Sequence, residues 1–350
     1  MGVIHRPFGN AKPMDRTNND DFHCFINRNN HHRHVFTNIS ANRCDKLTLN
    51  KVLISNFHVM TFLSFLQSQT PTFFWVCVAI IGCILGSFIN VVVVRLPIML
   101  KRQWHQECKE LKEHVPFNDI YPKKFNLCLP QSQCPQCHTK LRIRDNIPVL
   151  SFIGLKGRCH KCNSPISKRY PTIELISSLI IITSLSYFGS TLTGLAVAVM
   201  GLCLLALTCI DLDEMLLPDQ ITLPLLWLGL ILNLNHSFTS IEDAVIGAIA
   251  GYLSLWSVYW LFKILTGKEG MGYGDFKLFA VFGAWLGWQY LPFIILIASI
   301  MGTIIGLYLR WKQNHNESLA FPFGPSIAIS GWLHIFYGEY ILHWYFSNWI

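Results

Sequence analysis

Four of the twelve cysteines form two pairs with the spacing of a metal site. Cys134 and Cys137 make one C-x2-C pair, and Cys159 and Cys162 make a second pair after a gap of 21 residues. The two sulfurs of such a pair converge on one ion, so two pairs complete a tetrahedral site of four thiolates. The pattern predicts one structural Zn with no position left open for catalysis. The alternatives are a redox-active pair or unrelated buried thiols.

Acidic residues of the C-terminal half gather in two short segments. One runs from Asp211 to Asp219, and the other is Gly-Tyr-Gly-Asp-Phe-Lys at 272–277. Two carboxylates that share one proton can activate a water and polarise a scissile carbonyl. Asp211 and Asp275 are the candidates for this chemistry, but Asp275 alone could simply cap the helix that follows it. The other acidic residues of the first segment are expected at the membrane interface or in helix caps: Asp213, Glu214 and Asp219.

Long apolar runs surround these residues and must position them. The chain has 350 residues, of which 51% are hydrophobic and 14% are charged, whereas soluble domains carry about 25% charge. Such runs are typical of membrane helices. We expect an all-α polytopic membrane protein with about eight transmembrane helices, at about 73–94, 172–189, 191–210, 221–235, 244–265, 276–289, 291–309 and 326–345.

The charge distribution predicts the topology of these helices. Residues 95–170 hold 15 of the 28 Lys and Arg and only five Asp and Glu, so this region is expected to be a cytoplasmic, zinc-ribbon-like insertion after the first helix. Each predicted span crosses the membrane once, so the loops after 95–170 alternate between the two sides. Both acidic segments are then expected on the cytoplasmic face. The chain has net charge +8, which could indicate binding to a nucleic acid. Because the basic residues lie in a loop beside the membrane, anionic lipid headgroups are the expected partner of this insertion instead.

Residues 1–59 differ from the rest of the chain. They are rich in Asn, His and Arg, lack an apolar stretch, and contain eight Lys and Arg, which resist translocation although the topology places this end outside. We expect a disordered or non-native N-terminal extension. Met60 then begins the functional protein, with the first transmembrane segment in 60–94, the four-cysteine domain in 95–170 and the transmembrane core in 171–350.

The ordered motifs of residues 60–345 resemble the bacterial type IV prepilin peptidase family in its bifunctional form. Each motif is short, but six of them in order are far more specific than any one. They are Gly86-Ser87-Phe88-Ile89-Asn90-Val91 with Arg95-Leu96-Pro97; the two cysteine pairs flanking Asp145-Asn146-Ile147-Pro148; Arg169-Tyr170-Pro171 with Glu174; Asp211 to Pro218-Asp219; Gly272-Tyr273-Gly274-Asp275; and Pro322-Phe323-Gly324-Pro325.

The resemblance implies a GxGD aspartyl protease with Asp211 and Asp275 as its catalytic residues and 171–350 as its protease core. Members of the family cleave a short basic leader from type IV prepilins and type II secretion pseudopilins, typically after Gly and before Phe. They then N-methylate the new N-terminus with S-adenosyl-L-methionine as methyl donor. The resemblance also implies a multi-pass protein of the bacterial inner membrane with its active site at the cytoplasmic face.

The methyl-donor site has no recognisable sequence signature. No G-x-G-x-x-G loop follows a predicted strand. Asn90, Arg95 and Glu174 are candidates because they are polar residues at the ends of predicted spans. The alternative is that they snorkel to the interface and set topology.

Two other functions compete with this interpretation. One is a GxGD intramembrane protease with a different transmembrane substrate, which the four-cysteine domain and the Gly86–Val91 motif disfavour. The other is a non-enzymatic, zinc-containing membrane scaffold that docks a secretion ATPase of a pilus or secretion machine. The scaffold predicts that Asp211 and Asp275 are each dispensable.

Deleting residues 1–59 is expected to leave the activity intact, because the composition and charge of this segment set it apart from every motif. The measurement is prepilin processing by a protein that starts at Met60, in cells without another such enzyme. Loss of processing by the shortened protein would contradict the expectation.

Overall fold

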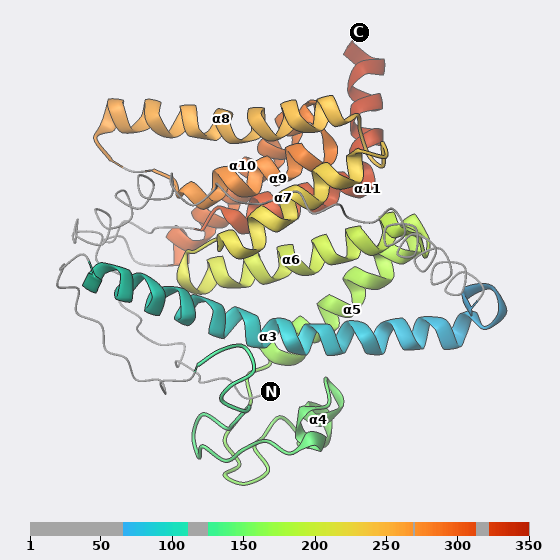
Figure 1. The fold of residues 1–350 in the computed structure, drawn as a ribbon, viewed down its shortest axis with the longest axis vertical. Helices are drawn as coiled ribbons and strands as arrows, with labels where there is room; N and C mark the ends of the chain where they lie inside the picture. Colours follow the sequence, from blue (N-terminus) through green and yellow to red (C-terminus); the bar gives the residue numbers. More distant parts are fainter. Residues whose placement is uncertain (1–65, 111–124, 269, 313–321, 350) are drawn as a thin grey trace, which may run out of the picture. The chain divides into compact units, whose positions relative to one another are not determined.

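The computed structural model describes residues 66–110, 125–268, 270–312 and 322–349, and within these ranges the chain is helical and forms no β-sheet (Figure 1). The predicted extension at 1–59 lies outside the described residues. The long helices are α3 (Pro71–Glu110), α5 (Arg169–Phe188), α6 (Leu192–Glu214), α7 (Asp219–Asn233), α8 (Ile241–Thr266), α9 (Tyr273–Leu286), α10 (Leu291–Lys312) and α11 (Gly324–Trp349). The short ones are η2 (Ile143–Asn146), α4 (Leu150–Gly154) and η3 (Trp288–Tyr290).

A helix occupies each of the eight ranges that the apolar runs predicted. Five segments of the described chain are long and apolar enough to cross a membrane: Pro71–Cys108, Arg169–Phe188, Leu192–Glu214, Ile241–Thr266 and Trp288–Tyr308. The all-helical, polytopic membrane fold is therefore confirmed, while the number of eight spans stays a prediction. One boundary differs from the prediction by more than a few residues. Helix α3 continues to Glu110, whereas the first span was expected to end near residue 94.

The chain divides into two compact units. One consists of Trp75–Val93 and Pro171–Ile350, and we call it the helical unit. The other contains Val94–Tyr170, which we call the cysteine unit, together with the N-terminal residues up to Phe74. Helix α3 contributes residues to both units.

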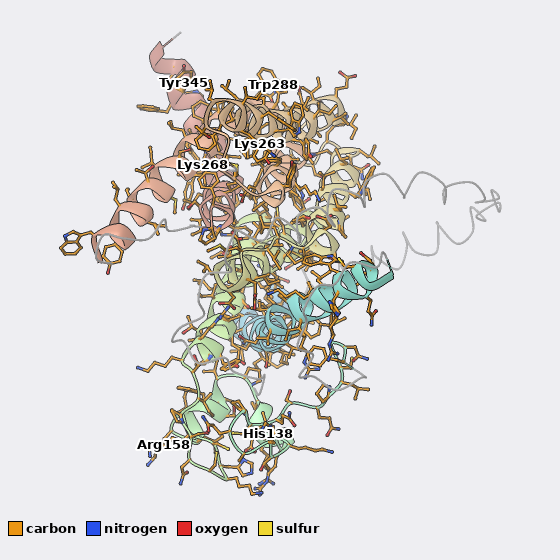
Figure 2. The ribbon with its side chains drawn as sticks, turned by 90° about the vertical axis from the view of Figure 1, so that its left-hand side faces the viewer. His138, Arg158, Lys263, Lys268, Trp288 and Tyr345 are labelled. Atoms are coloured by element: carbon orange, nitrogen blue, oxygen red, sulfur yellow. The ribbon has the colours of Figure 1, made fainter. Side chains whose placement is uncertain are left out.

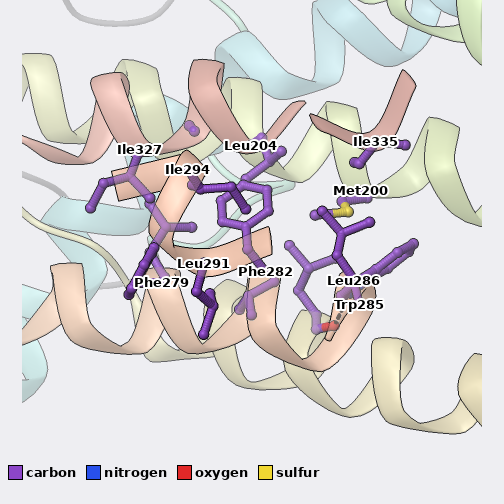
Figure 3. Packing of buried hydrophobic residues seen from close by; sticks show 14 of the residues in the cluster. Met200, Leu204, Phe279, Phe282, Trp285, Leu286, Leu291, Ile294, Ile327 and Ile335 are labelled. Carbon is purple, nitrogen blue, oxygen red and sulfur yellow. Dashed lines mark hydrogen bonds between the residues drawn. The ribbon is translucent and has the colours of Figure 1, made fainter. Parts of the chain in front are cut away.

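Helix α9 is the centre of the helical unit. Eleven of its 14 residues are buried, and its aromatic side chains Phe279, Phe282 and Trp285 form the middle of the hydrophobic core (Figure 3). Residues of five other helices complete this core, among them Met200 of α6, Leu225 of α7, Leu255 of α8, Ile294 of α10 and Ile327 of α11. A span in lipid needs about 20 residues, but a helix enclosed by other helices can be shorter because protein surrounds it.

Small residues allow the helices to approach closely. Gly247 of α8 and Gly283 of α9 face each other so tightly that a Cβ on either one would collide with the backbone carbonyl of the other. One turn along α8, a Cβ on Gly251 would lie 3.0 Å from the Cα of Ala280. Such small-residue contacts are a main source of helix association in membranes.

Buried polar side chains in this unit bond to helix backbone. The indole N–H of Trp285 donates to the carbonyl of Leu225 in α7 at 2.9 Å. Asn233 donates to the carbonyls of Ala284 and Trp285, both at 2.9 Å, and accepts from two backbone N–H groups that follow α7. These bonds hold the C-terminal ends of α7 and α9 together.

Replacing Gly283 with Val is expected to destabilise the helical unit, because the added carbons meet the backbone of Gly247. Overpacking of this kind costs about 1–3 kcal/mol. The measurement is the denaturant midpoint of the detergent-solubilised protein. The matched control is Gly306→Ala in α10, where the added Cβ meets nothing within 4 Å; a Gly283→Val protein as stable as this control would contradict the packing.

Candidate active site and metal centre

The cysteine unit brings the four predicted ligands together. The sulfurs of Cys134, Cys137, Cys159 and Cys162 all lie within 4.8 Å of one another. The closest pair that joins the two C-x2-C turns is Cys134 and Cys162, with sulfurs 3.7 Å apart. The spacing prediction is therefore confirmed as a cluster that could hold one metal ion.

The two cysteine turns have the same local fold. In the first, the N–H of Cys134 donates to the carbonyl of Thr139, and in the second the N–H of Cys159 donates to the carbonyl of Ser164, both at 2.9 Å. The residue after the second cysteine of each turn has a positive φ, +51° at His138 and +56° at Asn163. This left-handed residue reverses the chain, so both sulfurs of a pair face the same point.

The surroundings of Cys134 and Cys137 favour thiolates, whereas at Cys159 hydrogen bonds from the backbone of Cys162 lower the pKa but burial and the neighbouring sulfurs raise it overall. Burial alone would raise the pKa of the Cys134 thiol, but hydrogen bonds from the backbone of Cys137 and Gln136 lower it to about 6. The hydroxyl of Thr139, 3.3 Å from the sulfur of Cys137, lowers the pKa of that thiol too. His138 and Arg158, which flank the turns, are exposed on the cysteine unit (Figure 2).

Arg95 organises the start of the cysteine unit. Its buried guanidinium donates to the carbonyls of Asn126, Leu127 and Pro130, at 2.9, 3.2 and 2.6 Å. It also lies 5.7 Å from the ring centre of Phe125, and such a contact is favourable for a cation. Arg95 thus links the segment 125–130 to α3 instead of snorkelling. This candidate for the methyl-donor site therefore has a structural role.

Asp211 lies in the last full turn of α6 and is buried. Its Oδ2 atom has no hydrogen-bond partner of good geometry within the described residues. Gly324, the first residue of α11, lies against this oxygen: a Cβ on Gly324 would be 2.5 Å from it. The carboxyl group is therefore held in a tight, buried site beside the backbone N–H of Gly324.

Asp275 lies in the first turn of α9 and is also buried. Gly272 is the N-cap residue of this helix, so Asp275 is the third residue inside it. The N–H of Gly272 faces the Asp275 carboxyl group, and the charge of Asp211 acts on it. Leu217 packs against Gly274, which precedes Asp275, and against Gly324, which lies on the Asp211 carboxyl group. The two predicted carboxyl groups therefore lie near each other although they are far apart in sequence.

Asp219 does not belong to this pair. It begins α7, and its carboxylate accepts two hydrogen bonds from the ammonium group of Lys277 in α9, at 2.7 and 2.8 Å. Both side chains are partly exposed. This ion pair joins the first turns of α7 and α9 beside the two carboxylates.

Asn90 and Glu174, the other methyl-donor candidates, lie where α3 packs on α5. The backbone of α3 approaches α5 at Gly82 and Gly86, whose added Cβ atoms would meet the Cα atoms of Ser178 and Glu174. Asn90 is one turn further on and donates to the carbonyl of Gly86 at 3.2 Å. Asn90 and Glu174 are both buried, so these polar side chains lie inside the contact between α3 and α5.

Together, fold and site define a polytopic membrane protein with a pair of buried carboxylates and a separate four-cysteine cluster. Residues 198–307 match the model of the type IV leader peptidase family, and residues 80–188 match the bacterial Peptidase A24 N-terminal domain. No solved structure matches the chain.

Curated relatives of this chain carry the name prepilin leader peptidase/N-methyltransferase. One from Aeromonas hydrophila is 47% identical over 295 residues, which covers 83% of this chain and 100% of the relative. One from Pseudomonas putida is 47% identical over 83% of this chain and 98% of the relative. A third from Burkholderia pseudomallei strain K96243 is 50% identical over 74% of this chain and 84% of the relative. The chain belongs to the type IV leader peptidase family.

Proposed function

We propose that this chain removes the basic leader peptide from type IV prepilins and type II secretion pseudopilins and then N-methylates the new N-terminal residue, usually Phe. Its membership of a leader peptidase family and its identity to named prepilin leader peptidase/N-methyltransferases support both activities. The observation that carries the proteolytic mechanism is the proximity of the buried carboxylates of Asp211 and Asp275.

Asp211 and Asp275 divide the work of hydrolysis between them. Two carboxylates in one buried site share a single proton, because a second negative charge is unfavourable there. The ionised member takes a proton from a water as this water attacks the scissile carbonyl. The protonated member donates a hydrogen bond to the carbonyl oxygen, where negative charge develops.

The location of the carboxylates suits a leader on the cytoplasmic side. All Lys and Arg after residue 170 lie in or beside loops assigned to that side, which supports an active site at the cytoplasmic face of the bacterial inner membrane. A prepilin presents its basic leader there while its apolar helix lies in the bilayer. The scissile bond between the leader and the apolar helix then lies level with the C-terminal end of α6 and the N-terminal end of α9.

The four-cysteine cluster is proposed to bind one structural Zn. Four Zn–S bonds of about 2.3 Å in a tetrahedron place the sulfurs about 3.8 Å apart, and the sulfurs of Cys134 and Cys162 are 3.7 Å apart. All four positions of the ion are filled by protein, so its contribution is to hold the two cysteine turns together.

The methylation step uses S-adenosyl-L-methionine, which supplies an electrophilic methyl group. This chemistry requires the new N-terminal amine to be deprotonated and aligned with that methyl group. A shared-proton pair of carboxylates contributes nothing to this alignment. We therefore propose that the methyl donor is bound by groups other than Asp211 and Asp275.

The product mass of a prepilin incubated with the purified protein tests the proposed function. Without S-adenosyl-L-methionine the pilin should lose the mass of its leader only. With it, the pilin should also gain one methyl group. An uncut prepilin under both conditions would refute the proposal and would favour the scaffold.

Asp211→Asn and Asp275→Asn are each expected to abolish cleavage, because neither half of a shared-proton pair works alone. A loss of more than about 1,000-fold in kcat is typical for removal of such a catalytic group. Asp219→Asn should be milder, since Asp219 binds Lys277 and not the other carboxylates. Immunoblotting of membrane fractions verifies insertion, and full processing by either Asn variant would exclude that residue.

Asp275→Asn protein should still methylate a pilin that has already been cleaved. The measurement is label transfer from S-adenosyl-L-methionine to a pilin with a free N-terminal Phe. If wild-type protein transfers the label and well-folded Asp275→Asn protein does not, the two reactions share one site.

Purified active protein should contain about one Zn per chain. Changing any one of the four cysteines to Ser should lower the Zn content and make residues 125–168 more sensitive to protease, because metal binding provides much of the folding free energy of a small unit. Cys128→Ser is the matched control, since Cys128 lies outside the cluster. Active protein without Zn in elemental analysis would contradict the assignment.

A further inference from the structure

The linker between α6 and α7 brings a leucine to the two carboxylates. This linker, Met215–Pro218, follows directly from the helix that carries Asp211. Its residue Leu217 is partly buried and packs against the core. The side chain contacts two segments that lie far apart in sequence, namely the first turn of α9 and the start of α11.

Leu217 fills the space next to two glycines. A Cβ on Gly274 would lie 2.7 Å from the Cβ of Leu217 and 3.2 Å from its Cδ1. A Cβ on Gly324 would lie 3.2 Å from the same Cδ1, and 2.5 Å from Oδ2 of Asp211. Real Cβ atoms essentially never lie closer than 3.0 Å to such neighbours. Leu217 and the two glycines therefore form one interlocked contact.

Backbone conformation does not explain these glycines. Neither Gly274 nor Gly324 has a positive φ, and both lie within helices. The missing Cβ leaves room for Leu217 beside Gly274, and for the Asp211 carboxyl group together with the tip of Leu217 beside Gly324.

We propose that Leu217 is a positioning residue that sets the relative placement of Asp211 and Asp275. The inference rests on the proposed function of this pair. Gly274 directly precedes Asp275, and Gly324 lies against Asp211, so a side chain wedged against both glycines fixes the two carboxylates relative to each other. Two residues further on, the ion pair between Asp219 and Lys277 joins α7 to α9 and keeps the linker from moving away.

A pair of substitutions that enlarges the residue at Gly274 and shortens the one at Leu217 tests this proposal. Gly274→Ala should lower the kcat of prepilin cleavage about 100-fold, the effect typical of a displacement of about 1 Å in an active site. Adding Leu217→Gly should restore kcat to within about tenfold of wild type, because the closest atom to the new methyl group is the Cβ of Leu217, which glycine lacks. Leu216→Gly, one residue away, is the matched control and should not restore it.

Gly324→Ala provides the second arm of the test. Its methyl group collides with Asp211 and lies only 3.2 Å from Cδ1 of Leu217, so Leu217→Gly should fail to restore cleavage here. Leu217→Gly alone should lower kcat about tenfold and leave KM nearly unchanged, as expected when alignment and not substrate binding is lost. Denaturant midpoints of all variants, measured in detergent, separate misalignment from unfolding.

Each result decides the proposal. Rescue of Gly274→Ala by Leu217→Gly, together with no rescue of Gly324→Ala, supports it. Full activity of Gly274→Ala, or equal failure of Leu217→Gly and Leu216→Gly to rescue a folded Gly274→Ala protein, overturns it. Failure of the proposed function is recognised separately, because wild-type protein would then leave the prepilin uncut.

Discussion

Two buried carboxylates close to each other are the constraint on which the rest of the helical unit depends. Two full negative charges about 4 Å apart repel each other by about 4 kcal/mol at an effective dielectric constant of 20. In the proposed mechanism, Asp211 and Asp275 share one proton, and the surrounding helices prevent them from moving apart. The proposed sharing would give a water-activating base and a carbonyl-polarising acid at one place.

The packing of α9 satisfies the mechanical part of this constraint. Protein surrounds almost the whole helix, with Gly247 and Gly283 allowing α8 to approach its backbone and Trp285 bonding to α7. The first turn of α9 is additionally held by Leu217 and by the ion pair between Lys277 and Asp219. A rigid, enclosed helix thus presents Asp275 at its N-terminal end, while α6 presents Asp211 at its C-terminal end.

Sequence reasoning predicted the helices and the chemical groups better than the contacts between them. Apolar runs are a direct consequence of the membrane environment, so each expected range contains a helix, and the spacing of Cys134, Cys137, Cys159 and Cys162 is local enough to predict the cluster. The end of α3 was predicted too early, since hydropathy falls at Arg95 although the helix continues past Pro97 to Glu110.

The tasks of Arg95 and Leu217 could not be predicted, because both depend on contacts between distant segments. Arg95 looked like a snorkelling or ligand-binding residue, yet its acceptors are carbonyls more than 30 positions away, for example that of Asn126. An unremarkable leucine in a linker gave no signal at all. The only hint in the sequence was the glycine at 274 and the one at 324, which do not favour the helices that contain them.

The pH dependence of kcat/KM for prepilin cleavage by the purified protein tests the shared proton most directly. A pair that needs one ionised and one protonated member predicts a bell-shaped profile, with activity lost at low pH when both members are protonated and at high pH when both are ionised. A profile that rises with pH to a plateau and stays there, in protein that remains folded over the whole range, would show a single base and contradict the pair.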